Sequence, residues 1–466
     1  MNPPMSIALL VQRLQWPVPR VRWETARQLA NLVEAGDRQA RDALLAWSAS
    51  QRLEADGLIL PSLIYARTLN DQLSFQEVSK AIAAPSLLSD ALLAASYPDD
   101  AKRLFTFRLE YTKEGFNAPP EPLFDQGVTT VVPPIFRHAL DAEEHRTGLP
   151  FLDQWRGEWS ALQRVQEEAN SLAPDYFFAG DRGRTGAFDL RQRAVFVSAF
   201  LRTLTWAHLE CGMPRSYAIG MAELALPFNR GLFDFKGSER PVWSQGFLGR
   251  FEELGPAAFA RAAWRDAAAT LEAGFEPIAL DMIDHNERLA VRIQVQRVLA
   301  GEEPRDVEER QLAHPAWVST QGPRWSLEGT LPLPQRRRQT PGLRPLCVAA
   351  DPTVFGRAHI DLLGRLLLAD PLLATGPALL RCETDRLTLT DEGGLLSTLQ
   401  LWYADWIPTH PPEFGLTGSL TACRQAALRA FRAGCDVRTP RLAHVQIARR
   451  EQSYQPFEVT KRTFQL

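Results

Sequence analysis

Hydrophobic and polar positions near the start of the chain follow the period of an α-helix. Residues 20–34 place Val21, Ala26, Leu29 and Val33 on one face, which is typical of a helix that packs against a neighbour on one side. The same pattern, interrupted by proline and glycine, predicts further short helices at 6–14, 37–47, from 58 past 65, 75–82 and 86–95. We therefore expect the first hundred residues to form short paired helices.

Helical periodicity also dominates the middle of the chain. It predicts helices at 134–144, 152–172, 191–210, 215–226, 256–273 and 277–300. Weaker, strand-like patterns occur at 103–111 and 128–132. The helix at 191–210 is apolar nearly all round, which indicates burial on most of its faces.

The pattern breaks between 301 and 345, where prolines and the run Arg336–Arg338 replace any periodicity. This composition predicts a linker or an irregular connection. Beyond it the pattern is mixed, with strand-like stretches at 346–350, 386–390, 444–447 and 457–464, helices at 359–368 and 419–433, and either element at 395–402.

Residues 18–30 read Val-Pro-Arg-Val-Arg-Trp-Glu-Thr-Ala-Arg-Gln-Leu-Ala and resemble the second helix of a HEAT repeat, a family of stacked helical hairpins. The resemblance covers one repeat well and two more poorly, over about residues 5–97. Thr25 stands where an alanine is commoner in the family, and the aspartate of the family's turn is missing.

This resemblance implies hairpins that must stack to bury their apolar faces and that present a concave surface to another macromolecule. On that basis four residues are expected to contact a partner: Arg20, Arg22, Trp23 and Arg27. HEAT-like modules in bacteria often accompany anti-phage defence systems, so the resemblance also implies that context.

The expected fold is mainly α. It comprises HEAT-like helical repeats at 1–98, a mainly helical central domain at 99–300, a Pro/Arg-rich linker or irregular connection at 301–345, and a smaller α/β (α+β) domain at 346–466.

Composition restricts the function classes. The chain has 466 residues, of which 45% are apolar and 23% charged, which excludes a disordered or fibrous protein. A formal charge of −3 argues against a protein that coats polyanions. Five cysteines without a CxxC pair, and a start that does not resemble a secretory leader, predict a cytoplasmic protein that does not enter a membrane.

Common catalytic signatures are missing from the sequence. It contains no GxxxxGK[ST], GxGxxG, HExxH or GxSxG motif, so it offers no familiar site for phosphate, a dinucleotide, zinc or an acyl intermediate. We expect no cofactor.

Weak candidate sites remain, and the first is a metal site. His138, Asp141 and His145 share one face of a predicted helix and could offer two imidazoles and a carboxylate to a divalent metal. The neighbouring Glu143 and Glu144 favour a solvated helix end instead.

The second candidate is catalytic. Asp281, Asp284 and His285 share a face of the predicted helix at 277–300, and a carboxylate beside a histidine can orient it as a general base. The same residues could instead pair with Arg288 or Arg292 along the helix.

The third candidate is an anion site. The loop Gly180–Gly186 carries Arg182 and Arg184 and precedes the helix at 191–210, whose N-terminus favours negative charge. Asp181 within the loop favours an ordinary connection.

Together these observations predict a non-catalytic scaffold or regulatory component of a bacterial multi-protein complex, with a partner protein encoded in the same operon. One alternative is a hydrolase or phosphate-handling enzyme of unfamiliar type. A second alternative is a HEAT-like nucleic-acid-binding protein, which the net charge does not favour.

Overall fold

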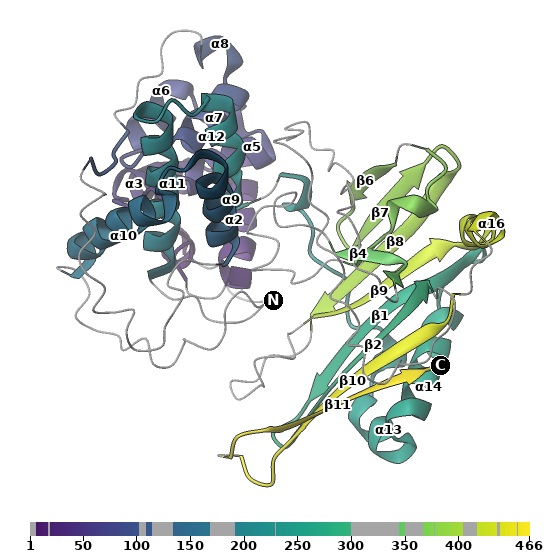
Figure 1. The fold of residues 1–466 in the computed structure, drawn as a ribbon. Helices are drawn as coiled ribbons and strands as arrows, with labels where there is room; N and C mark the ends of the chain where they lie inside the picture. The colour runs from purple at the N-terminus through teal and green to yellow at the C-terminus, as the bar shows by residue number, and fades with distance from the viewer. Residues whose placement is uncertain are drawn as a thin grey trace.

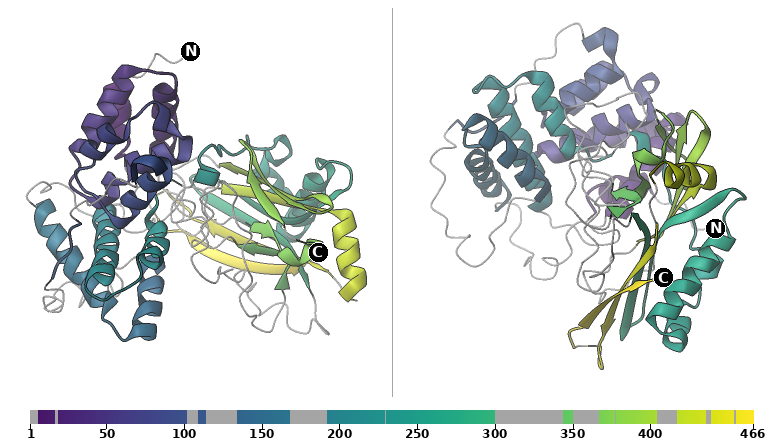
Figure 2. Two further views of the ribbon diagram at one scale, coloured as in Figure 1. Left: turned by 90° about the horizontal axis from the view of Figure 1, so that it is seen from above. Right: turned by 45° about the vertical axis from the view of Figure 1, so that its right-hand side comes forward.

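The computed structural model of this chain describes residues 6–16, 19–101, 109–113, 134–167, 192–228, 230–299, 344–349, 367–376, 378–403, 417–435, 439–453 and 455–466. These residues form a helical part and a large antiparallel sheet that lie side by side (Figure 1). Figure 2 shows the same two parts from two other directions.

The helices of the helical part are short. They are α1 (Ile7–Arg13), α2 (Pro19–Glu34), α3 (Arg38–Ala49), α4 (Glu54–Gly57), α5 (Ile59–Arg67), α6 (Phe75–Ala81), α7 (Leu87–Ser96), α8 (Pro98–Ala101), α9 (Pro134–Thr147), α10 (Phe151–Glu167), α11 (Gln192–Leu209) and α12 (Arg215–Ala222). Three more helices accompany the sheet: α13 (Phe247–Leu254), α14 (Pro256–Ala269) and α16 (Gln425–Cys435).

Local chemistry explains where several helices begin and end. Gly36 ends the turn after α2 with a φ of 81°, which glycine adopts without steric cost. The side chain of Asp37 then accepts a hydrogen bond from the amide of Ala40 at 3.0 Å and caps α3. At α7, Ser86 and Ser89 cap each other's backbone amides. The predicted helices at 20–34 and 37–47 are confirmed, whereas the resemblance to HEAT repeats stays a prediction.

The helical part has an apolar core of its own. It joins α4, α5 and α7 to α9–α12, around Phe136, Phe151, Trp155 and Phe200. The rings of Phe136 and Phe200 stack with centroids 4.3 Å apart. The predicted helix at 191–210 is therefore confirmed as α11, and Phe200 and Leu204 within it are fully buried.

The sheet runs in the order β11-β10-β2-β1-β9-β8-β7-β6, and β3 pairs with β2. Its strands are β1 (Phe275–His285), β2 (Leu289–Leu299), β3 (Arg344–Pro345), β6 (Leu379–Cys382), β7 (Arg386–Asp391), β8 (Gly394–Tyr403), β9 (Thr417–Arg424), β10 (Arg441–Arg449) and β11 (Glu458–Gln465). Two further strands, β4 (Cys347–Ala349) and β5 (Leu367–Ala369), pair separately.

This sheet shows that the predicted mainly α fold class is wrong. The predicted helix at 277–300 is the β1–β2 hairpin, with Asp281 opposite Gln294. The predicted helix at 419–433 divides into the end of β9 and the start of α16. Strand β1 is buried on both faces over most of its length. Apolar residues therefore occupy both of its faces and, apart from Asp281, do not alternate with polar residues as they do in a half-buried strand.

The two faces of the sheet pack against different elements. Leu280, Val291, Val295 and Val445 belong to a core shared with α13 and α14, on one side of the sheet. On the other side, strands β6–β9 share a core with the N-terminal helices. The helical part and the pair α13–α14 thus lie on opposite sides of the sheet (Figures 1 and 2).

Residues 230–238, which we call the connector, join the helical part to the sheet. Leu232, Phe233 and Phe235 are buried in the core that reaches from α1 to β9. The amide of Lys236 donates to the carbonyl of Thr384 at 2.7 Å, and the amide of Ser238 donates to that of Leu401 at 2.8 Å. The connector therefore holds the sheet by backbone hydrogen bonds as well as by apolar contact.

The main sheet contains strands from both sides of the predicted linker at 301–345. Strands β1 and β2 precede the linker, the short β3 lies at its end, and the other strands of the main sheet follow it. Most of that linker lies outside the described residues. In the part of the chain that is described, no helix combines the length and the apolar character that crossing a bilayer requires.

Candidate functional site

The predicted interaction residues on α2 contact the chain itself. The indole Nε1 of Trp23 donates to the carbonyl of Phe233 at 3.0 Å, and Arg27 donates from Nη1 to the carbonyl of Phe235 at 2.9 Å. Trp23 is buried and Arg22 is partly buried, while the side chain of Arg20 lies outside the described residues. This face of α2 therefore binds the connector.

The candidate metal residues do not form a site in the described structure. His145 is exposed, and its Nδ1 lies 2.8 Å from the backbone carbonyl of Asp141 on the same helix, α9. The side chain of His138 lies outside the described residues. Among the residues that are described, no three histidine, cysteine or acidic side chains gather closely enough to hold a metal ion.

The candidate catalytic residues lie on strand β1 and not on a helix, so the shared face that the sequence predicted does not exist. Asp281 and His285 point to one face of the sheet and Asp284 to the other, because side chains alternate along a strand. Asp284 pairs with Arg240 at 2.9 Å. The candidate anion residues Arg182 and Arg184 lie outside the described residues.

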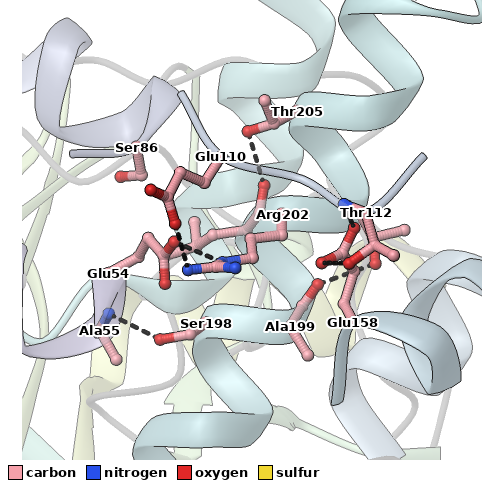
Figure 3. Close-up of polar contacts among 12 residues, drawn as sticks. Glu54, Ala55, Ser86, Glu110, Thr112, Glu158, Ser198, Ala199, Arg202 and Thr205 are labelled. Atoms are coloured by element: carbon pink, nitrogen blue, oxygen red, sulfur yellow. Dashed lines mark hydrogen bonds and ion pairs between the residues drawn. The ribbon is translucent and has the colours of Figure 1, made fainter. Parts of the chain in front are cut away.

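A buried ionic cluster occupies the middle of the helical part (Figure 3). Arg202 on α11 donates from Nε to Glu54 at 2.5 Å and from Nη2 to Glu110 at 3.1 Å. Glu54 is almost fully buried, whereas 69% of the Glu110 side chain is exposed. Only the Glu54 partner is thus shielded from water.

The same cluster holds the short segment 109–113 against α10. The amide and hydroxyl of Thr112 donate to Glu158 at 2.5 and 2.9 Å, and Gln154 donates to the Thr112 carbonyl at 2.8 Å. Burial raises the pKa of the Glu158 carboxyl, and the hydrogen bonds from Thr112 oppose that shift. Burial likewise raises the pKa of Glu54 against the opposing charge of Arg202. We interpret this cluster as a set of polar contacts that hold the helical part together.

The second polar feature is one half of a sheet face. Opposite α13 and α14, the strands β1, β2, β10 and β11 present polar side chains in register, and we call these the polar half-face: Asp281, Arg292, Gln294, Gln296, His444, Gln446, Lys461 and Thr463. The same side of β6–β9 is apolar and packs in the core shared with the N-terminal helices. The polar half-face is therefore a separate polar region beside that core, buried at Asp281 and Gln296 and exposed at Lys461.

Charge is balanced where the polar half-face meets β1. Arg292 donates to both oxygens of Asp281, at 3.0 and 2.5 Å, and Gln294 donates to the same carboxylate at 2.9 Å. On β10, Nδ1 of His444 lies 3.2 Å from the hydroxyl of Thr463. Burial and the nearby charges of Lys461 and Arg292 lower the pKa of His444, so this imidazole is neutral at neutral pH.

The third feature is the edge strand β11. Its residues 458–462 are all exposed, and within the described chain it pairs only with β10. The amide of Leu466 donates to the carbonyl of Arg441 at 2.8 Å, so even-numbered residues of β11 bond to β10. The backbone N–H and C=O groups of the odd-numbered residues, including Val459, Lys461 and Thr463, consequently point away from the sheet.

The edge also carries positive charge at its centre. Lys461 and Arg462 are adjacent, exposed, and project to opposite faces of β11. If two copies of this chain paired through β11, the two longest antiparallel registers would place Lys461 opposite Lys461 or Arg462 opposite Arg462. Like charges placed opposite each other destabilise a strand pair.

No family model and no curated protein matches this chain. The polar features are therefore interpreted from their geometry alone.

Part of these sites has a signal in the sequence. Arg202 interrupts an otherwise apolar helix, and a charge at such a position indicates a buried partner. Its partner Glu54 is 148 residues away in sequence, and no pattern connects the two. The exposed edge of β11 had no signal, because the predicted strand at 457–464 does not reveal its place in a sheet.

Proposed function

We propose that this protein is a non-catalytic interaction component that captures an extended, acidic segment of a partner protein as an added strand on β11. The observation that carries the proposal is the exposed edge of β11 with its outward backbone groups. An exposed edge of this length is a template for pairing with another strand.

Charge at the edge defines the chemistry of the partner. Lys461 and Arg462 favour aspartate or glutamate in the facing strand, and their repulsion in a self-pair disfavours a second copy of this chain. The proposal thus keeps the expected partner protein but moves its binding site from α2, whose Trp23 and Arg27 bind the connector, to the edge of the sheet.

The polar clusters described above support a binding role over catalysis. Asp281 is held by three donors and Asp284 by Arg240. Glu158 is likewise held by Thr112 and Gln154. Carboxylates engaged in this way are poorly placed to exchange protons with a substrate.

The test is a pair of substitutions at one position. Lys461→Pro removes an outward N–H and leaves the ladder to β10 intact, since proline is tolerated on an edge where its nitrogen faces solvent. Lys461→Ala keeps the N–H and removes the charge. Each full-length chain is immobilised and challenged with a lysate of the cells that encode it, and bound proteins are identified by mass spectrometry.

We expect the wild-type chain to retain a partner that Lys461→Pro loses. Lys461→Ala should weaken retention by no more than about fivefold, because an exposed ion pair contributes about 0.2–1 kcal/mol. Amide hydrogen exchange at Val459, Lys461 and Thr463 should slow in the complex. If Lys461→Pro retains the same proteins as the wild type, the proposal is wrong.

A further inference from the structure

The polar half-face has buried hydrogen-bonding atoms that the described chain does not satisfy. Gln296 is 4% exposed and its Oε1 has no hydrogen-bond partner. The Oε1 of Gln446 is buried and equally without a partner. Buried polar atoms are almost always paired in folded proteins, and leaving one unpaired is destabilising. Two such atoms on one face therefore indicate a group that the described part of the chain does not provide.

The same face has positive charge at one end. Arg292 on β2, Gln446 on β10 and Lys461 on β11 are cross-strand neighbours in one row. Arg292 is neutralised by Asp281, whereas Lys461 has no ion-pair partner in the described part of the chain. This row consequently carries a net charge of about one positive unit and a buried amide between two cations.

In the next row Asp281 lies opposite Gln294, and His444 and Thr463 follow on β10 and β11. The Asp281 carboxylate pairs with Arg292, so this row adds no unpaired charge. Gln296 lies one row further along β2 and is neutral. Rows are about 7 Å apart, because side chains on one face repeat every second residue. The face thus changes from cationic to neutral over about 14 Å along β2.

We propose that the polar half-face binds a phosphorylated small molecule that also carries hydroxyl or amino groups, such as a sugar phosphate or a nucleotide. The phosphate contacts Lys461 and Arg292, and a hydroxyl beside the phosphate donates to the unpaired amide oxygen of Gln446 in the same row. A second donor group of the ligand reaches the amide oxygen of Gln296, two rows away along β2. His444 and Thr463 lie in the row between and supply neutral hydrogen-bonding groups. This inference does not rest on the capture of a strand by β11.

The proposal can be tested by titration calorimetry of the full-length chain with adenosine monophosphate, ribose 5-phosphate, inorganic phosphate and adenosine. We expect adenosine monophosphate and ribose 5-phosphate to bind and inorganic phosphate to bind more weakly. Adenosine should give no heat at the same concentration. A stronger signal from adenosine monophosphate than from ribose 5-phosphate would identify a nucleotide, and equal signals would identify a sugar phosphate. If neither adenosine monophosphate nor ribose 5-phosphate binds, the proposal is overturned.

Two substitutions locate the site. Lys461→Ala should weaken binding of ribose 5-phosphate at least tenfold, while Arg462→Ala should leave it unchanged, because Arg462 is the neighbouring cation on the opposite face of β11. Equal losses in the two variants would mean non-specific attraction to a basic strand and would contradict the proposal.

Gln446→Leu separates a binding role from a structural one. Leucine has a similar volume and removes the unpaired amide, so it should raise the melting temperature and abolish binding together. A variant that is stabilised and binds ribose 5-phosphate as well as the wild type would show that Gln446 contacts no ligand, which the proposal does not allow.

Discussion

The indole of Trp23 donates its hydrogen bond to the backbone carbonyl of Phe233, which lies 210 residues further along the chain. Arg27, one helical turn later on α2, donates to the carbonyl of Phe235. Arg67 on α5 adds an ion pair with Asp234 at 2.5 Å. The N-terminal helices therefore bind three consecutive residues of the connector. A helix face that the sequence marks as suitable for a protein partner is used to position the chain's own sheet.

Replacing Trp23 by phenylalanine tests the contribution of its hydrogen bond to the connector. The substitution leaves a buried carbonyl without its donor, so we expect a loss of about 1–3 kcal/mol in the free energy of unfolding, measured by urea denaturation. Trp159→Phe is the matched control, because the indole Nε1 of buried Trp159 has no hydrogen-bond partner. It should cost clearly less. Equal losses in the two variants would mean that ring size, and not the hydrogen bond, stabilises the connector.

Glu223 should make stability depend on pH. Burial raises the pKa of its carboxyl to about 10, so in neutral solution the group is protonated when folded and ionised when unfolded. Its stabilising effect is complete below the ordinary pKa near 4.5 and is lost as the pH rises towards 10. Glu223→Gln should therefore raise the free energy of unfolding by about 1–3 kcal/mol at pH 8 and change it little at pH 4.

The measurement is a pair of urea titrations at those two pH values. Glu252→Gln provides the control, since Glu252 is exposed on α13 and should have no effect at either pH. A Glu223→Gln variant that is less stable than the wild type at pH 8 would contradict a neutral, buried carboxyl.

Removing only one partner of the ion pair between Arg202 and Glu54 should lower the free energy of unfolding strongly. Arg202→Met leaves Glu54 buried without its counter-ion, and we expect a loss of about 3–5 kcal/mol. The double substitution Glu54→Leu with Arg202→Met should recover much of that loss, because it removes both charges. Glu110→Gln should cost less than about 1 kcal/mol, because that partner is exposed.

Faster hydrogen exchange at the amide of Thr112 would accompany the loss in Arg202→Met, since the cluster holds segment 109–113. If the double variant is no more stable than the single one, the loss in Arg202→Met does not come from leaving Glu54 buried without its counter-ion.

Two glycines in helices should respond oppositely to alanine. A Cβ at Gly57 would lie 2.4 Å from the backbone oxygen of Ala84, whereas one at Gly249 would meet nothing within 4 Å. Gly57→Ala should therefore lower the free energy of unfolding by about 1–3 kcal/mol, and Gly249→Ala should raise it by about 0.5–1 kcal/mol. Thermal denaturation of both variants would show whether α4 packs against residue 84 as closely as described.

Local signals in the sequence were sufficient for the helices and insufficient for the sheet. Asp37 caps α3 as its position before an apolar repeat predicts. The β1–β2 hairpin was mistaken for a helix, because Ile278 to Ile283 are buried on both faces and carry no alternation. Val291, Ile293 and Val295 do alternate with polar residues on β2, which was the available sign of a strand.

The candidate sites show the same division. The resemblance to a HEAT repeat singles out Trp23 and Arg27 as interaction residues, and the spacing on a predicted helix singles out Asp281 as a catalytic candidate. Their partners are Phe233, Phe235 and Arg292, and the two long-range pairs depend on how distant segments meet. The sequence also offers Arg292 as an ion-pair partner along a helix, and Arg292 does bind Asp281, but across the β1–β2 hairpin.

The order of strands in the sheet has a consequence for how the protein is made. Strands β1 and β2 end at residue 299, but their outer neighbours β9 and β10 begin at residues 417 and 441. A ribosome thus releases an apolar hairpin long before it supplies the strands that flank it, and non-local pairing of this kind is slow. A chain that ends before residue 417 because of a premature stop codon would leave both edges of that hairpin unpaired. Premature termination is therefore a direct route to aggregation.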